Sequence, residues 1–227
     1  AIALEARLQG AHIGYGPILD LAREPRWSRV EETMGEDPML TGTLGVAFVQ
    51  GLQGSDIADG RHLYATPKHF AGYGVPVGGH NGQPSALGQR ELFSAHLEPF
   101  RMGVNAGVKT LMTSYNAIDG IPATAHRYLL TDVLRDQWGF DGFVISDLGS
   151  IEGIAGTHRV AANVKQAASM ALRAGVDADL GGNAYGGSLM EALEEGLITM
   201  EEIDRAASNI LRMKFEMGLF ENPYVDP

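Results

Sequence analysis

The sequence contains no cysteine in its 227 residues. This absence excludes disulfides, thiolate chemistry and cysteine-ligated zinc or iron–sulfur sites. Positive charge is also scarce, because 17 Lys and Arg stand against 28 Asp and Glu, giving a net charge of −11 at pH 7. An acidic surface repels phosphate groups, so we expect no nucleic acid partner and no anionic membrane partner. There is no run of about 18 consecutive apolar residues, so we expect no membrane span.

Apolar residues and glycine are well represented. Hydrophobic residues make up 44% of the chain, which is enough for a sizeable core and argues against disorder. The 30 glycines amount to about 13% of the residues, against a usual ~7%. They show no period, so we assign them to turns and to places where the backbone is approached closely.

Apolar segments of strand length alternate along the chain with amphipathic segments of helix length. We expect strands at residues 12–21, 63–70, 108–115, 143–147 and 176–180, and helices at 38–53, 89–104, 128–138, 164–174, 188–196 and 199–217. This alternation predicts an α/β fold with a parallel sheet covered by helices. An open doubly wound sheet and a (β/α)8 barrel both fit. A dinucleotide-binding sheet is less favoured, because no GxGxxG motif follows a strand. Five strands are too few to close a barrel, so we expect one incomplete domain.

Polar residues at the carboxyl ends of these strands are the first candidates for chemistry, because such ends form the active sites of parallel α/β folds. They are residues 20–29, Lys68 and His69, Tyr115 and Asn116, Asp147, and Asp177 and Asp179. Asp147 has an equally good alternative role as the cap of the following helix. Neighbouring residues on a strand point to opposite faces, so only an irregular strand end would bring Lys68 and His69 into one pocket.

The segment from Glu24 to Pro38 is dense in charge. It is either a solvated loop held by internal ion pairs or part of a site, and the second interpretation requires at least one arginine to turn inward. The seven histidines show no HExxH or other ligand spacing, so we expect no metal site.

Six motifs follow one another in a distinctive order. They are 16–29 (GPILDLAREPRWSR), 31–38 (EETMGEDP), 68–71 (KHFA), 79–92 (GHN and GQREL), 112–116 (MTSYN) and 139–147 (GFDGFVISD). Together they resemble the motifs of glycoside hydrolase family 3, which contains retaining β-glucosidases and β-xylosidases. The resemblance implies a TIM-barrel-like (β/α)8 domain, present here without its first strands and without the second α/β domain of the family.

The resemblance also implies roles for individual residues. Asp147 matches the catalytic nucleophile, and Arg29 matches a ligand of the sugar hydroxyls. Lys68 and His69 match a pair that grips the glycone, with a cis or irregular peptide near them. Met112 matches the pocket floor, and Tyr115 matches a residue beside the nucleophile. One departure stands out, because Leu148 occupies a position at which the family often has tryptophan.

The implied activity is that of a retaining, exo-acting β-glycosidase. It would remove a terminal β-D-glucosyl or xylosyl residue from an oligosaccharide through a covalent glycosyl–Asp147 intermediate, with no cofactor. Residues 1–220 would form the partial barrel, and residues 221–227 would begin an interdomain linker. The acid/base glutamate would come from the remainder of the polypeptide, which is the expected partner. By analogy with the family, we expect a periplasmic or secreted location.

Three alternatives remain at this point. A β-N-acetylhexosaminidase of the same family would use an Asp–His pair in the loop after KHF, but residues 72–90 contain His80 and no aspartate. A Schiff-base lyase would use the amine of Lys68. A barrel fragment that binds sugar without cleaving it is the third. The sequence does not predict an oligomeric state.

Overall fold

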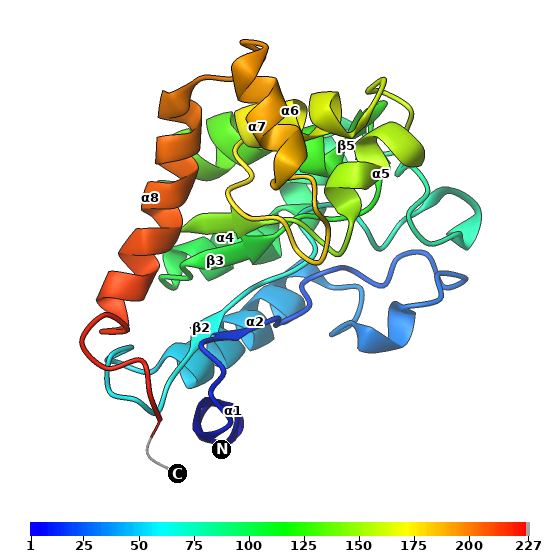
Figure 1. The fold of residues 1–227 in the computed structure, drawn as a ribbon. Helices are drawn as coiled ribbons and strands as arrows, with labels where there is room; N and C mark the ends of the chain where they lie inside the picture. The colour runs from blue at the N-terminus through cyan, green and yellow to red at the C-terminus, as the bar shows by residue number, and fades with distance from the viewer. Residues whose placement is uncertain (226–227) are drawn as a thin grey trace.

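The computed structural model describes residues 1–225 (Figure 1). The strands are β1 Ile13–Gly14, β2 Tyr64–Ala65, β3 Thr110–Met112, β4 Ala117–Ile118, β5 Ile121–Pro122 and β6 Phe143–Ile145. The α-helices are α1 Ile2–Leu8, α2 Pro38–Gln53, α3 Gln89–Glu91, α4 Glu98–Asn105, α5 Ser150–Gly156, α6 Val164–Ala174, α7 Gly187–Glu194 and α8 Met200–Glu216. Short 3-10 turns are η1 Val30–Glu32, η2 Val77–Gly79 and η4 Ala123–Ala125, and π-helical segments are η3 Leu92–His96 and η5 Tyr128–Gln137.

Five parallel segments form the sheet in the order of the sequence. β1 pairs with β2 and β3 pairs with β6, both in parallel. The bridge Phe70–Thr113 joins the two pairs, and the bridge Ile145–Ala178 adds the fifth segment. The predicted positions of the strands are therefore confirmed, but their predicted lengths are wrong. The first strand is short because the Gly16 N–H turns back to the Gly14 carbonyl at 2.9 Å instead of pairing across the sheet.

Alternating side chains of the strands point to two different layers. In β6, Val144 enters the larger core, which the helices α2, α4, η5 and α6 complete. Its neighbours Phe143 and Ile145 point the other way and pack with Met213 and Met217 at the end of α8. This period of two is the geometry of a strand with both faces covered. It explains why the segment is apolar throughout.

The long helices pack against other helices and against the sheet. α2 contacts α4, and α6 contacts both α5 and α7, while α8 contacts α6 and β6. In Figure 1, α2 lies below the strands, α5, α6 and α7 lie above them, and α8 runs along the left edge. The predicted helix ends are confirmed at three positions. Asp37 caps α2 through the Leu40 N–H at 2.7 Å, Gly175 ends α6 with φ of 112°, and Thr199 forms a capping box with Glu202.

Several elements differ from the sequence-based expectation. The hairpin of β4 and β5 was not expected, although its turn, Asp119 and Gly120, has the positive φ values of 50° and 79° that favour these residue types. The expected helix 89–104 is divided into α3, η3 and α4. Pro99 explains where α4 starts, because proline has no N–H for the preceding turn and fits the first turn of a helix. α1 and α5 were also not expected.

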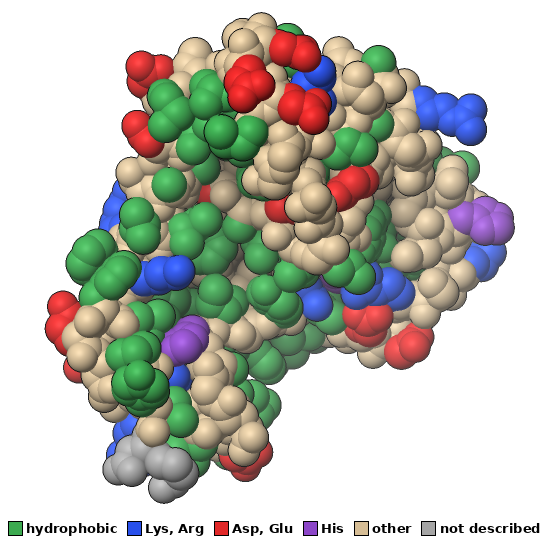
Figure 2. All heavy atoms as spheres, in the orientation of Figure 1, with side chains coloured by type: hydrophobic (Ala, Val, Ile, Leu, Met, Phe, Trp, Pro, Cys, Tyr) green, Lys and Arg blue, Asp and Glu red, His purple; other side chains and the backbone are tan. Residues whose placement is uncertain are grey.

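The surface is uneven in charge. In Figure 2, acidic side chains gather at the top of the molecule, where Figure 1 places α7 and the start of α8. α8 also exposes the apolar side chains Leu211 and Phe215.

Within residues 1–225, no helix has both the length and the apolar character needed to cross a membrane.

His96 makes the stability of the fold dependent on pH. Its side chain is 2% exposed, and burial, assisted by the charge of Arg23, lowers its pKa to about 4, although Glu91 lies 4.0 Å from Nε2. Below about pH 6.5 this histidine binds a proton in the unfolded chain but stays neutral in the folded chain. The free energy of unfolding therefore decreases as the pH is lowered, by up to about 3 kcal/mol at pH 4. Urea unfolding at several pH values should show this slope. It should be smaller in His96→Gln and unchanged in a variant of the exposed His80, His80→Gln. Equal slopes in wild type and His96→Gln would contradict the assignment.

Candidate active site

Asp147 lies two residues beyond β6, with its side chain 11% exposed. Oδ1 accepts a hydrogen bond from the Leu148 N–H at 2.7 Å. Oδ2 is buried, and among the described residues no group forms a hydrogen bond with it. The N-cap of α5 is Gly149, with φ of 66°, and this helix has no side-chain cap. The interpretation of Asp147 as a helix cap is therefore wrong, and one carboxylate oxygen is left with a lone pair for chemistry.

His69 faces this oxygen, with its Nε2 3.5 Å from Asp147 Oδ2. Asp20 holds the histidine from behind, because its Oδ2 accepts from Nδ1 at 2.7 Å and from the His69 backbone N–H at 3.2 Å. On the other side, an Arg29 Nη2 lies 3.2 Å from Nε2. A carboxylate only accepts, so the contact with Asp20 places a proton on Nδ1, whereas Nε2 lies between a guanidinium, which only donates, and the Asp147 carboxylate, which only accepts. His69 is thus held in one orientation.

Arg29 is the arginine of the charged loop that turns inward. It donates two hydrogen bonds to Glu32, at 2.7 and 2.8 Å, and its Nη1 lies 3.5 Å from the Tyr73 hydroxyl. Hydrogen bonding from Arg29 is the main cause that lowers the pKa of Glu32, and the charge of Lys68 adds to it. Lys68 therefore lies within electrostatic reach of the same cluster. The loop also contains the expected internal ion pairs, and its role as part of a site stays a prediction.

Tyr73 forms an aromatic wall behind the cluster. Its ring lies 5.0 Å from Trp27, 4.9 Å from His69 and 6.0 Å from Tyr115, measured between centroids. Its hydroxyl donates to Asn81 Oδ1 at 2.6 Å, and the same oxygen accepts from the Trp27 indole at 2.9 Å. Burial raises the pKa of Tyr73. The wall is therefore neutral and fixed at several points.

Tyr115 lies between this wall and the nucleophile loop. Its hydroxyl donates to the Leu148 carbonyl at 2.9 Å. Burial first, and then the negative charge of Asp147, raise the pKa of Tyr115. The hydroxyl thus stays protonated and remains a donor at neutral pH.

Lys68 and Met112 are the two remaining predicted site residues, and only Lys68 belongs to the polar cluster. The peptide bond between Lys68 and His69 is cis, as the resemblance implied, and so is the bond between Phe70 and Ala71. Met112, 2% exposed, packs in the apolar cluster with Tyr64, Phe143 and Ile145. The structure thus gathers Arg29, Lys68, His69, Tyr115 and Asp147 at the carboxyl ends of the strands, whereas the role of Met112 as a pocket floor stays a prediction.

Proteins of similar sequence and structure identify the family of the chain. The profile described as "Glycosyl hydrolase family 3 N terminal domain" matches residues 1–213. The chain belongs to glycosyl hydrolase family 3. A periplasmic β-glucosidase of Salmonella typhimurium is 38% identical, and the match covers 98% of this chain and 29% of that protein. A putative β-xylosidase of Formosa agariphila is 40% identical, and the match covers 99% of this chain and 30% of that protein. The crystal structure of a β-glucosidase from Listeria innocua superimposes with a TM-score of 0.94 at 40% identity, over 98% of this chain and 31% of that one.

Membership of family 3 confirms the α/β, TIM-barrel-like fold class. The chain spans about 30% of the length of these relatives. Their names are those of β-glucosidases and β-xylosidases, so the hexosaminidase, the lyase and the non-catalytic interpretations are not favoured. The division into a domain at 1–220 and a linker at 221–227 stays a prediction, and residues 226 and 227 lie outside the described part of the chain.

Sequence reasoning missed the supporting residues of the site. Asp20 stood at the end of the first predicted strand, where a carboxylate is a reasonable candidate, yet nothing in the sequence paired it with His69. Glu32, three residues after Arg29, had the spacing of an ion pair. Tyr73 gave no signal, and Asn81 stood in the GHN motif without an assigned role, because both lie in a loop whose shape depends on contacts with distant segments.

Proposed function

We propose that this chain carries the nucleophile and glycone-binding part of a retaining, exo-acting β-glycosidase. Its substrate is an oligosaccharide with a β-D-glucosyl or xylosyl residue at the non-reducing end. The observation that carries the proposal is the buried, unbonded Oδ2 of Asp147, 3.5 Å from a histidine that Asp20 and Arg29 hold in place. The β-glucosidases and β-xylosidases among the relatives support it.

In this mechanism, Asp147 Oδ2 attacks the anomeric carbon while the bond from that carbon to the leaving-group oxygen breaks. The departing oxygen takes up a proton, and water then hydrolyses the glycosyl ester. Arg29 and Lys68 supply charged donors for the sugar hydroxyls, and charged hydrogen bonds are stronger than neutral ones. Hydrogen bonds that become stronger as the sugar ring becomes oxocarbenium-like lower the activation barrier. Hydrogen bonds that are equally strong in the ground state and the transition state do not lower it.

Covalent labelling tests the proposal directly. A 2-deoxy-2-fluoroglucosyl fluoride carries a leaving group that needs little acid assistance, and its ester with Asp147 should accumulate. Mass spectrometry should find one added glycosyl unit on the peptide that contains Asp147. Comparison with the xylosyl analogue would identify the preferred glycone. A label on another residue, or undiminished labelling of Asp147→Asn, would overturn the assignment.

Arg29 should be far more sensitive to replacement than its neighbour Arg26. Lysine keeps the charge of Arg29 but cannot bind both Glu32 oxygens and reach His69 as well. We expect Arg29→Lys to slow fluorosugar labelling about 10- to 100-fold, the loss of one or two charged hydrogen bonds. Arg26→Lys is the matched control, because Arg26 pairs with Glu24 in the same loop but is 69% exposed. Similar effects of the two variants would show that the loop, and not Arg29, matters.

The same proposal extends to compartment and partner. The Salmonella relative is named periplasmic, which supports a periplasmic or secreted location. The relatives are about three times as long as the part that this chain matches, which supports a further part of the polypeptide as the partner of this domain. Fractionation of the source cells, with detection of the polypeptide by size, would test both points.

A further inference from the structure

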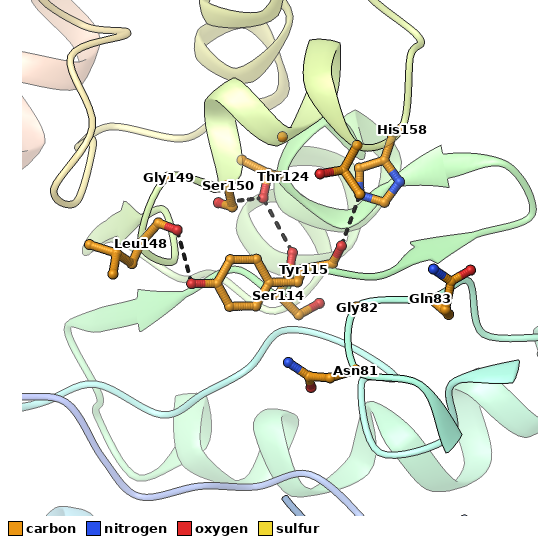
Figure 3. Close-up of a pocket in the computed structure, with 12 residues that line it drawn as sticks. Asn81, Gly82, Gln83, Ser114, Tyr115, Thr124, Leu148, Gly149, Ser150 and His158 are labelled. Carbon is orange, nitrogen blue, oxygen red and sulfur yellow. Dashed lines mark hydrogen bonds between the residues drawn. The ribbon is translucent and has the colours of Figure 1, made fainter. Parts of the chain in front are cut away.

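A cavity of about 460 Å³ lies between the β4–β5 hairpin, the segment 87–93 and the start of η5. Its volume falls within the usual range of roughly 300–1,000 Å³ for small-molecule sites. Its lining residues differ from those of the hollow drawn in Figure 3, which surrounds Tyr115 beside the nucleophile loop. They also differ from the polar cluster around Asp147. The cavity is therefore a place apart from the candidate active site.

The walls of this cavity are aromatic and aliphatic. The ring centroids of Phe93 and Tyr128 are 6.4 Å apart with the planes at 54°, and those of His126 and Tyr128 are 6.5 Å apart at 46°. Ile118 is buried, whereas Ile121, its partner across the hairpin, is 44% exposed, so the cavity runs from the core to the surface. Aromatic rings attract one another in such tilted arrangements. A flat aromatic ligand suits these walls better than a sugar, because each buried hydroxyl of a sugar needs a partner.

His126 is the polar group inside the cavity. It is 8% exposed, and among the described residues no group forms a hydrogen bond with its buried Nδ1. Burial lowers the pKa of His126, although the charge of Asp119 acts in the opposite direction, so the ring is neutral at pH 7. A neutral imidazole has one donating and one accepting nitrogen. A hydroxyl group also donates and accepts, so it matches the hydrogen-bonding capacity that the protein leaves unused here.

The charge at the cavity decides against an anionic ligand. Among the lining residues of the described chain, Asp119 is the charged one, and it is exposed at the turn of the hairpin. A carboxylate or a phosphate would be repelled by it and would find no cation to pair with. The ligand that fits is therefore neutral.

We propose that this cavity is a second ligand site, which takes a small, neutral aromatic molecule with a hydroxyl group, that is, a phenol. The ring of the phenol packs against Phe93 and Tyr128, and its hydroxyl binds the His126 imidazole. This inference goes beyond the proposed function and does not depend on it, because the lining residues take no part in the chemistry at Asp147.

Nuclear magnetic resonance of the 227-residue chain, labelled at the isoleucine δ1-methyl groups, tests the site. The probe is 4-methylphenol, and 1,4-dimethylbenzene is the matched molecule with a methyl group in place of the hydroxyl. Both should shift the signals of Ile118 and Ile121 until saturation and leave Ile145, two residues before Asp147, unchanged. The anion 4-hydroxybenzoate should bind more weakly than 4-methylphenol.

His126→Phe keeps a ring at this position and removes both nitrogens. It should weaken 4-methylphenol binding about 2- to 10-fold, the effect of one neutral hydrogen bond, and change 1,4-dimethylbenzene binding by less than about twofold. His80→Phe, at an exposed histidine outside the cavity, is the control and should change neither affinity. Ile121→Asp changes an exposed position, so it should fold, and its charge should weaken the binding of both molecules.

Three results would overturn the inference. The first is a shift of the Ile145 signal in place of those of Ile118 and Ile121, which would locate the phenol at the active site. The second is a His126→Phe variant that weakens both molecules equally or neither. The third is a dependence of the Ile118 and Ile121 signals on protein concentration without ligand, which would mean that a second copy of the chain fills the cavity.

Discussion

Replacing Asp147 with asparagine is expected to lower the rate of 2,4-dinitrophenyl β-glycoside cleavage by roughly 10⁴- to 10⁶-fold, the scale on which removal of a catalytic nucleophile or its partner acts in other covalent enzymes. The amide keeps the shape of the side chain and its contact with the Leu148 N–H, but it replaces the oxygen that faces His69 with a much weaker nucleophile. Steady-state release of dinitrophenolate measures the effect. The leaving group is chosen because it departs without a proton, so only the attack is tested.

Two further variants make this result specific. Asp141→Asn changes an exposed aspartate that pairs with Lys109, and its rate should stay within about twofold of wild type. Asp147→Gly opens space at the nucleophile, where azide can attack the anomeric carbon from the same face as the lost carboxylate. The product should then be the α-glycosyl azide, because one displacement inverts a β-glycoside. An Asp147→Asn rate within tenfold of wild type would remove this residue from the nucleophile position.

The order of strands and helices along the chain was predictable because it depends on local sequence patterns. Apolar runs such as 143–147 have the length and composition of buried strands, and amphipathic runs such as 164–174 end at glycine. Strand ends then pointed to Asp147, His69 and Tyr115. These predictions needed no knowledge of the distances between segments.

What could not be predicted depends on contacts between distant segments. The sequence left Asp147 equally good as a helix cap, and only the backbone decides, because Gly149 occupies the cap. The partner of His69 lies 49 residues away at Asp20. Asn81 acquires its position from Trp27 and Tyr73, which reach it from two loops. Asp20, Asn81 and Asp147 are polar and lie in loops, where neither periodicity nor propensity distinguishes a support of the site from a surface residue.

The 227-residue chain is expected to depend strongly on the leaving group. The two carboxylates that support the cluster are engaged as acceptors: Asp20 accepts two hydrogen bonds from His69, and Glu32 accepts two from Arg29, whose hydrogen bonding lowers the pKa of Glu32. General acid catalysis contributes about 10²- to 10⁴-fold where a proton must be supplied. An alkyl β-glucoside should therefore react more slowly than the dinitrophenyl glucoside by at least this factor beyond any difference in binding.

A series of aryl glycosides with graded leaving-group acidity measures this dependence as the slope of log kcat/KM against leaving-group pKa. The slope should be steep and negative. With no acid to deprotonate, kcat/KM should show no fall on the alkaline side of neutral pH. A shallow slope with a bell-shaped profile would mean that an acid lies within the chain. Asp179 is the first candidate for it, because burial and the charge of Glu152 raise its pKa. In that case Asp179→Asn should restore the steep slope and remove the alkaline limb.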